Sequence, residues 1–260
     1  MTRSLLPLAI ALLLLPGLQA APACTLRVRQ HADDHALIRL PDGRRSGPQV
    51  ETVREAARRI GCRIELLAMP WARALAELEA GRLDVLPDAH RSSEREAYAW
   101  FSASTWPSNN RLFMRVADLQ AADAPGSLEA FAARRLRLGV QVGVRYSGSI
   151  DSLLASERFA GLVVRASNRQ GLWQMLALGR VDGVLTDEGT GRRELPQLGL
   201  EGRVAVAPMI LEGEASHTAF SRATVRPELV ARFDAALEAM RRDGSAAEIE
   251  HRFRAAAERE

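Results

Sequence analysis

The chain has 260 residues, of which 47% are hydrophobic and 26% charged. This composition excludes a disordered protein and allows one or two folded domains. All 35 basic residues are arginine, and the formal net charge is only +3. The arginines are scattered along the chain instead of following one element, so we expect no nucleic-acid partner.

The first twenty residues have the pattern of a secretory signal. Arg3 precedes an apolar stretch at 5–15, and small residues follow at 18–20. This stretch is too short for a membrane-spanning helix, and no later segment approaches the roughly 18 apolar residues that such a helix needs. We therefore expect residues 1–20 to be a signal peptide cleaved after Ala20, and the mature protein to be periplasmic.

Beyond the signal, strand patterns alternate with helix patterns, which is typical of α/β layering. Pro70 opens one helix at its first turn, and Gly81 stands just past its end. The expected strands are 25–29, 63–67, 83–87, 111–116, 136–140, 162–165, 181–186, 204–210 and 217–222, and the other expected helices are 49–60, 149–156, 168–178, 227–242 and 245–257.

One element occurs twice, at 71–88 and at 172–187. Each copy is a helix, a stop at Gly81 or Gly179, and a short buried strand that runs out into polar residues. In open α/β sheets, ligands bind beyond the carboxyl ends of the strands. The repeat therefore predicts two similar lobes, each with a sheet flanked by helices, that offer strand ends to a shared cleft.

The chain is expected to leave the first lobe, build the second and return. We place the first lobe at 21–114 plus 209–260 and the second at 115–208. No long flexible linker separates these parts, so the two crossings should be short strands that act as a hinge.

Cys24 and Cys62 each stand immediately before a predicted strand. If the two strands are parallel neighbours, the thiols lie side by side at one end of the sheet, and an oxidising compartment would join them. The alternative is a lipid anchor on Cys24 after cleavage at Ala23, although Ala-Pro-Ala is a poor lipoprotein signal.

Three stretches in order carry a resemblance to a known family. They are 70–84, with Pro70-Trp71 at its start; Ser92-Ser-Glu-Arg95 followed by Phe101-Ser102; and 178–188, Leu-Gly-Arg-Val-Asp-Gly-Val-Leu-Thr-Asp-Glu. With these spacings the mature chain resembles extracellular family 3 solute-binding proteins, the polar amino acid type that feeds ABC importers. The resemblance implies a two-lobed type II periplasmic binding fold.

The resemblance also implies roles for particular residues. Arg95 matches the arginine that grips the ligand α-carboxylate, with Ser92 as the assisting hydroxyl. Asp187 matches the acceptor of the α-ammonium, and Trp71 the aromatic wall of the side-chain pocket. An arginine fork suits a carboxylate, and placing opposite charges on separate lobes makes closure depend on the solute.

Further matches are less direct. The second-lobe turn that adds amide and hydroxyl donors corresponds to Tyr146 and Ser147, and backbone contacts are expected near Asp88 and His90. The loop at 31–37 lacks the aromatic lid of the family and carries charge instead, so the identity of the ligand stays open.

Simpler interpretations remain for these residues. Arg95 could be a surface residue of a charged turn, Asp187 the cap of a helix that begins at Glu188, Trp71 a core residue, and His90 a polar loop residue. His31 and His35 stand four apart in a loop without further ligands, so we expect no metal site.

The sequence thus predicts a monomeric, non-enzymatic binding protein without a cofactor. It would close on a small zwitterionic or anionic solute and deliver it to an inner-membrane ABC permease. One alternative is a sensory or accessory module that signals to a membrane partner. Another is an enzyme of the cyclohexadienyl dehydratase type on the same scaffold, with Glu188 or Asp88 as the acid.

Overall fold

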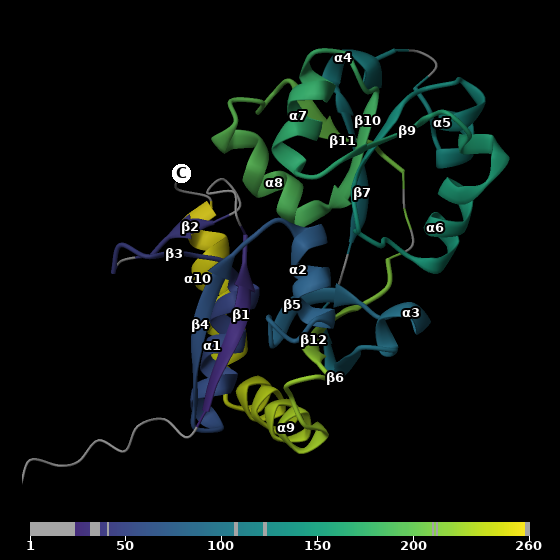
Figure 1. The fold of residues 1–260 in the computed structure, drawn as a ribbon. Helices are drawn as coiled ribbons and strands as arrows, with labels where there is room; N and C mark the ends of the chain where they lie inside the picture. The colour runs from purple at the N-terminus through teal and green to yellow at the C-terminus, as the bar shows by residue number, and fades with distance from the viewer. Residues whose placement is uncertain are drawn as a thin grey trace, which may run out of the picture.

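The computed structural model describes residues 24–31, 37–40, 42–106, 109–121, 124–209, 211 and 213–257. The expected signal peptide at 1–20 and His35 lie outside these ranges. Within them, none of the helices has the length and apolar character needed to cross a membrane. The described chain forms two lobes, each built on its own five-stranded sheet (Figure 1).

The first lobe is a mixed sheet covered by helices. Its strands lie in the order β4 (Cys62–Ala68), β1 (Cys24–Gln30), β5 (Val85–His90), β12 (Ser216–Ser221) and β6 (Ala99–Trp106). Strands β4, β1 and β5 are parallel, and β12 is antiparallel to both of its neighbours. The helices and the remaining short strands are α1 (Pro48–Arg59), α2 (Trp71–Glu79), α3 (Ser93–Glu96), α9 (Pro227–Arg242), α10 (Ser245–Ala257), β2 (Ile38–Arg39) and β3 (Arg45–Ser46).

The second lobe repeats this plan. Its strands lie in the order β11 (Val204–Val206), β7 (Asn110–Arg115), β10 (Gly183–Asp187), β8 (Leu138–Gln141) and β9 (Val163–Ala166). Strands β10, β8 and β9 are parallel, and β7 is antiparallel to β10 and β11. The helices are α4 (Val116–Leu119), α5 (Leu128–Ala133), α6 (Gly148–Ala155), the 3-10 helix η2 (Glu157–Phe159), α7 (Arg169–Ala177) and α8 (Glu188–Gln197).

The chain passes between the sheets twice, once between β6 and β7 and once between β11 and β12. The expected first boundary, after residue 114, falls too late along the chain. Strand β7 pairs with β10 and β11, so it belongs to the second lobe. A strand pattern alone does not say which sheet the strand joins.

Each lobe has its own hydrophobic core. In the first, Phe220 of β12 meets Phe233 of α9 edge to face, with ring centroids 5.0 Å apart. In the second, Phe113 of β7 meets Trp173 of α7 in the same way at 5.3 Å. Apolar burial of this kind is the main favourable contribution to folding.

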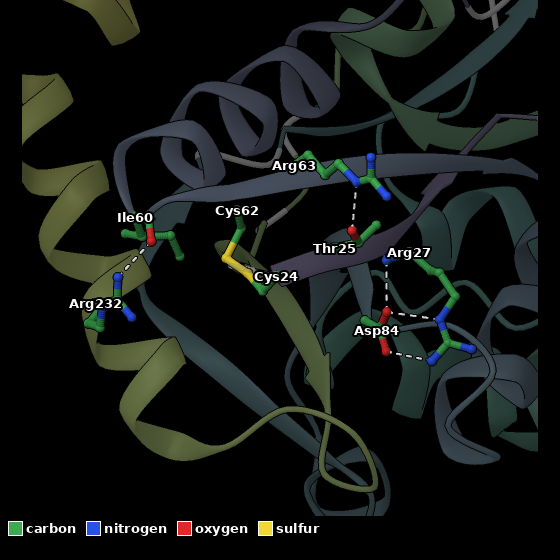
Figure 2. The surroundings of a disulfide bond; sticks show 8 residues. All are labelled: Cys24, Thr25, Arg27, Ile60, Cys62, Arg63, Asp84 and Arg232. Atoms are coloured by element: carbon green, nitrogen blue, oxygen red, sulfur yellow. Dashed lines mark hydrogen bonds and ion pairs between the residues drawn. A yellow bond between two sulfur atoms is a disulfide. The ribbon is translucent and has the colours of Figure 1, made fainter. Parts of the chain in front are cut away.

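The sequence repeat corresponds to a repeated polar clamp. In the first lobe, Asp84 accepts hydrogen bonds from the backbone and guanidinium of Arg27 (Figure 2). The guanidinium of Arg27 also donates to the Gly81 carbonyl. In the second, Asp182 and Arg137 make the same set, with the Gly179 carbonyl as the additional acceptor.

The two clamps share a backbone requirement as well. Gly81 has φ +69° and Gly179 has φ +68°, a left-handed conformation that glycine adopts without a steric penalty. Each clamp therefore fixes the turn between a helix and the strand that follows it, β5 in one lobe and β10 in the other.

The predicted disulfide is confirmed. Strands β1 and β4 pair in parallel with Cys24 opposite Cys62, their Cα atoms 4.7 Å apart, and the two sulfurs are bonded (Figure 2). A sulfur in a disulfide cannot also carry a lipid thioether, so this pairing excludes the alternative of a lipid anchor on Cys24.

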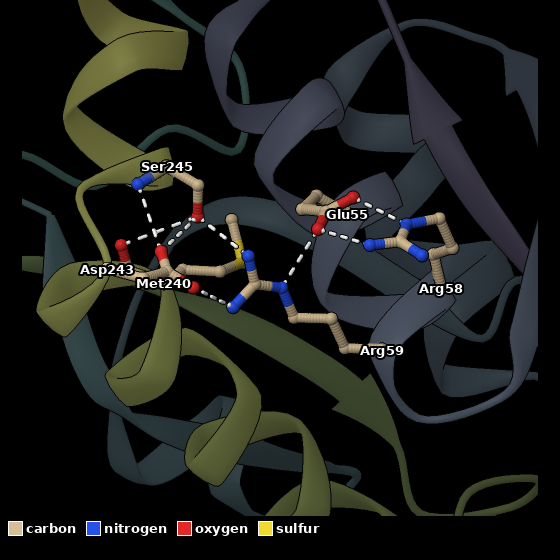
Figure 3. A network of polar contacts seen from close by, with 6 residues as sticks. All are labelled: Glu55, Arg58, Arg59, Met240, Asp243 and Ser245. Atoms are coloured by element: carbon tan, nitrogen blue, oxygen red, sulfur yellow. Dashed lines mark hydrogen bonds and ion pairs between the residues drawn. The ribbon is translucent and has the colours of Figure 1, made fainter.

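A network of hydrogen bonds holds the C-terminal helices of the same lobe to α1. Arg59, at the end of α1, donates to Asp243 Oδ2 at 2.6 Å, to Ser245 Oγ at 2.9 Å and to Glu55 Oε1 at 2.8 Å (Figure 3). Hydrogen bonds from Arg58 and Arg59 lower the pKa of Glu55 to about 2. The α9–α10 turn is thereby attached to α1 by an ionised network.

The disulfide should stabilise the first lobe through its unfolded state. It closes a loop with a sequence separation of 38, for which chain entropy predicts about 3 to 4 kcal/mol. We expect the Cys24→Ala, Cys62→Ala double variant to lose that much free energy of unfolding in a urea titration. An unchanged midpoint relative to the oxidised protein would contradict this.

The clamps should be required in both lobes. Asp84→Asn removes the negative charge that is paired with a partly buried arginine, so we expect a loss of roughly 2 to 3 kcal/mol. Asp182→Asn should cost less, because Arg137 is more exposed than Arg27, 45% against 34%. Urea unfolding measures both variants, and equal or negligible losses would refute the expected order.

Candidate functional site

A cavity lies between the lobes, at the carboxyl ends of β5 and β10. The cavity has a volume of about 90 Å³, which is room for roughly six to nine water molecules. A small solute of amino acid size matches this space. The charged and imidazole side chains that line it are Arg29, His31, Asp88 and His90 of the first lobe and Arg145, Arg169, Asp187 and Arg193 of the second.

Asp187 is both the cap of a helix and a residue of the cavity wall. It is the N-cap of α8, with Oδ1 accepting from Thr190 N at 2.9 Å and Oδ2 from Asn109 N at 3.3 Å. It also lines the cavity. A capping carboxylate remains negatively charged, so Asp187 can still attract a cation from the cavity.

Asp88 lies on the opposite wall, in β5. Its φ is +62°, and its carboxylate accepts a hydrogen bond from Ser216 Oγ of the neighbouring strand β12. A non-glycine residue in this conformation is strained, and such strain is concentrated at functional sites. The fold holds this side chain at the cavity despite the backbone cost.

Trp71 begins α2 and lies in the cavity wall. The Arg29 guanidinium stands over its ring, 5.2 Å from the centroid, within the range of a cation–π contact. Arg29 Nη2 lies 3.4 Å from His31 Nδ1. Burial, with further contributions from Arg29, Arg169 and Arg193, lowers the pKa of His31 well below 6.5 and keeps the imidazole neutral.

Arg95 does not line this cavity, contrary to what its motif implies. It is 4% exposed and donates from Nη1 to the His90 carbonyl at 2.7 Å and from Nη2 to the Gly143 carbonyl at 2.8 Å. Trp71 Nε1 donates to the same Gly143 carbonyl at 2.9 Å. Two first-lobe side chains therefore hold one second-lobe carbonyl, and we call this three-residue contact the Gly143 latch.

The other predicted residues have structural partners. Ser92 caps α3, accepting from Arg95 N, and Ser147 caps α6, accepting from Ile150 N. Neither lines the cavity. Tyr146 does line it, but its hydroxyl donates to the Leu185 carbonyl.

His90 lines the cavity, and burial lowers its pKa. Among the described residues its Nδ1 has no hydrogen-bond partner. The carbonyl at this strand end is taken by Arg95, so the imidazole is the part of His90 that remains for a solute.

Four arginines of the cavity were absent from the predicted site: Arg29, Arg145, Arg169 and Arg193. Arg169 donates to both oxygens of Glu194, which also accepts from Trp173 Nε1 at 2.7 Å. Burial acts to lower the pKa of Arg169, but the Glu194 carboxylate offsets this and leaves the pKa raised. The sequence did offer one signal for Arg193, because Asp187 followed by Glu188 indicates the start of the helix α8 that carries it.

Features needed by the enzyme alternative are weak in the described part of the chain. Glu188 forms ion pairs with Arg111 and Arg192, and their hydrogen bonds lower its pKa. A general acid at neutral pH needs a raised pKa. Across the described residues, no three His, Cys, Asp or Glu side chains lie together in a way that would hold a metal ion.

The two sheets, their crossings and the cavity between them define a type II periplasmic binding protein fold. A family profile described as bacterial extracellular solute-binding proteins, family 3, matches residues 30–256. The chain therefore belongs to this family, as its motifs predicted, and it is a solute-binding protein. A search of curated proteins found no match.

Solved structures agree with this fold. An ancestral arginine-binding protein bound to arginine matches with a TM-score of 0.73 at 23% identity, covering 88% of this chain and 97% of that one. A histidine kinase sensor domain with similarity to periplasmic binding proteins gives 0.73 at 20%, covering 88% and 95%. An amino acid ABC transporter substrate-binding protein from Streptococcus pneumoniae, bound to L-arginine, gives 0.70 at 18%, covering 90% and 94%.

The Gly143 latch should favour contact between the lobes in the ligand-free protein. Removing both donors, in Arg95→Ala with Trp71→Phe, leaves the carbonyl without its first-lobe partners. We expect the radius of gyration of the ligand-free variant to increase in small-angle X-ray scattering.

Arg91→Ala is the matched control, because Arg91 is an exposed arginine of the same loop, 59% accessible and paired with Glu96. It should scatter like the unchanged protein. A double variant as compact as the unchanged protein would rule out the latch.

Proposed function

We propose that this protein is an exported receptor that closes its two lobes on a small zwitterionic or anionic solute of amino acid type and delivers it to an ABC importer. The observation that carries the proposal is the cavity between the lobes, with carboxylates and guanidinium groups on its walls. A zwitterion is costly to desolvate unless both of its charges are met, and this cavity offers partners for both.

Asp187 is the proposed partner of the solute's ammonium group. It lies at the end of β10 on the cavity wall, and the hydrogen bonds that it accepts from Thr190 and Asn109 come from backbone amides rather than from a cation. Trp71 and Val144 provide apolar surface on the same cavity. Opposite charges with an apolar wall are the features that a small amino acid requires.

Export and delivery rest on the sequence and on similarity. The predicted signal peptide at 1–20 would bring the chain to the periplasm, where a disulfide such as Cys24–Cys62 persists. A similar structure is a substrate-binding protein of an amino acid ABC transporter. These observations support a role next to an inner-membrane permease.

A sensory role is the second candidate. It is favoured by the likeness to a histidine kinase sensor domain, which has the same fold at a TM-score of 0.73. Both roles use solute-dependent closure, so they differ in the membrane partner. A permease gene beside this gene would favour transport, and a kinase gene would favour signalling.

Isothermal titration calorimetry against a panel of amino acids and small organic anions tests the proposal. We expect saturable binding of one or more of these solutes at one site. For a solute with an ammonium group, Asp187→Asn should weaken binding by roughly 30-fold or more, because it leaves a desolvated charge unpaired.

Asparagine is as good an N-cap as aspartate, so this variant keeps α8 while it removes the charge. A deaminated analogue of the same solute is the control and should bind both proteins alike. Failure of every solute in the panel to bind would refute the proposed function.

A further inference from the structure

Arg193 is a half-buried cation of the cavity, and it has no ion pair among the described residues. Its guanidinium lines the cavity, Nη2 donates to Thr190 Oγ1 at 3.2 Å, and Nε is buried without a hydrogen-bond partner among the described residues. Burial lowers its pKa, while the nearest carboxylates, led by Asp187, act in the opposite direction. A buried charge without a partner is unfavourable unless something else supplies the opposite charge.

Other arginines of the same cavity are neutralised by the protein itself. Arg169 is paired with Glu194 at 2.7 Å, and Arg145 with Asp151 at 3.2 Å. These two have a counter-charge before any solute arrives. Arg193 differs from them because no described carboxylate lies within ion-pair distance of it, so the missing counter-charge points to the contents of the cavity.

The local fold brings Arg193 to this position. Gly191 of α8 lies against the Phe113 ring of β7. A Cβ added at this glycine would come within 2.3 Å of a ring carbon. Helix α8 can therefore approach β7 closely. Asp187, Thr190 and Arg193 recur at intervals of three, and all three line the cavity.

Asp187 and Arg193 thus present opposite charges on one cavity wall without forming an ion pair with each other. An α-amino acid has its ammonium and carboxylate one carbon apart, and such a pair of groups complements a carboxylate and a guanidinium on neighbouring turns of one helix. The arginine fork can also bind a carboxylate through two hydrogen bonds.

We infer that Arg193 binds the anionic group of the solute, and that Arg95 acts on the lobes through the Gly143 latch instead of touching the solute. This inference rests on the proposed function and assigns one contact within it. It assigns the carboxylate to the same lobe and helix as the ammonium partner. Solutes that lack an anionic group are therefore excluded from tight binding.

The test compares three variants against the tightest-binding amino acid of the panel and against its decarboxylated amine. Arg193→Gln should weaken binding of the amino acid by at least roughly 30-fold and bring its affinity close to that of the amine. Arg192→Gln is the matched control on the same helix, since Arg192 is exposed and paired with Glu188, and it should bind within about two-fold of the unchanged protein.

A thermal melt of the ligand-free protein separates a ligand contact from a structural role. Arg193→Gln removes a half-buried charge that has no ion pair among the described residues, so the melting temperature should stay the same or rise while binding weakens. Arg95→Gln should retain the preference for the amino acid over the amine, because the carboxylate contact is still present.

Distinct results overturn the two claims. If the unchanged protein binds an amino acid and Arg193→Gln binds it equally well, the assignment of Arg193 is wrong and the proposed function stands. The assignment is also wrong if Arg95→Gln alone abolishes the preference over the amine. If no solute binds the unchanged protein, the proposed function fails and the assignment fails with it.

Discussion

The ion pair between an aspartate and an arginine at the start of the repeated strand is the constraint on which the rest of the structure depends. Asp84 pairs with Arg27 of β1, and Asp182 pairs with Arg137, which directly precedes β8. The first pair joins β1 to the turn after α2, and the second joins β8 to the turn after α7. Each carboxylate accepts from a backbone amide and a guanidinium of the same residue. The direction of β5 and β10 is thereby set in both lobes by one arrangement of atoms.

The site follows from the direction of those two strands. β5 ends in the residues that include Asp88 and His90, and β10 ends in Asp187, so both ends reach the cavity between the lobes. These charges are unfavourable in themselves, since Asp88 has a strained backbone and the buried Nε of Arg193 has no hydrogen-bond partner among the described residues. A fold that tolerates such costs in one place is consistent with selection for binding there.

Elements with strong periodicity and clear ends could be predicted from the sequence, because their buried faces and stop signals are local. Helix α2, between Pro70 and Gly81, and the Cys24–Cys62 pairing are examples. For helix α8 only a possible start at Glu188 was predicted and not its extent, because its sequence has two glycines and a proline and little apolar repeat. Whether Arg95 faces a solute or the Gly143 carbonyl depends on how the lobes meet, which no local pattern contains.

The carbonyl of Gly143 accepts hydrogen bonds from two first-lobe donors, Trp71 and Arg95. If this contact forms before the solute binds, a larger fraction of the ligand-free protein is already closed. Less of the binding free energy is then needed for closure, and the apparent affinity is closer to the intrinsic affinity. The same contact restricts entry, because a solute can enter only those molecules whose lobes are open. The association rate therefore falls as the open fraction falls. The hydrogen bonds to the Gly143 carbonyl would thus lower the association rate and lengthen the lifetime of the complex.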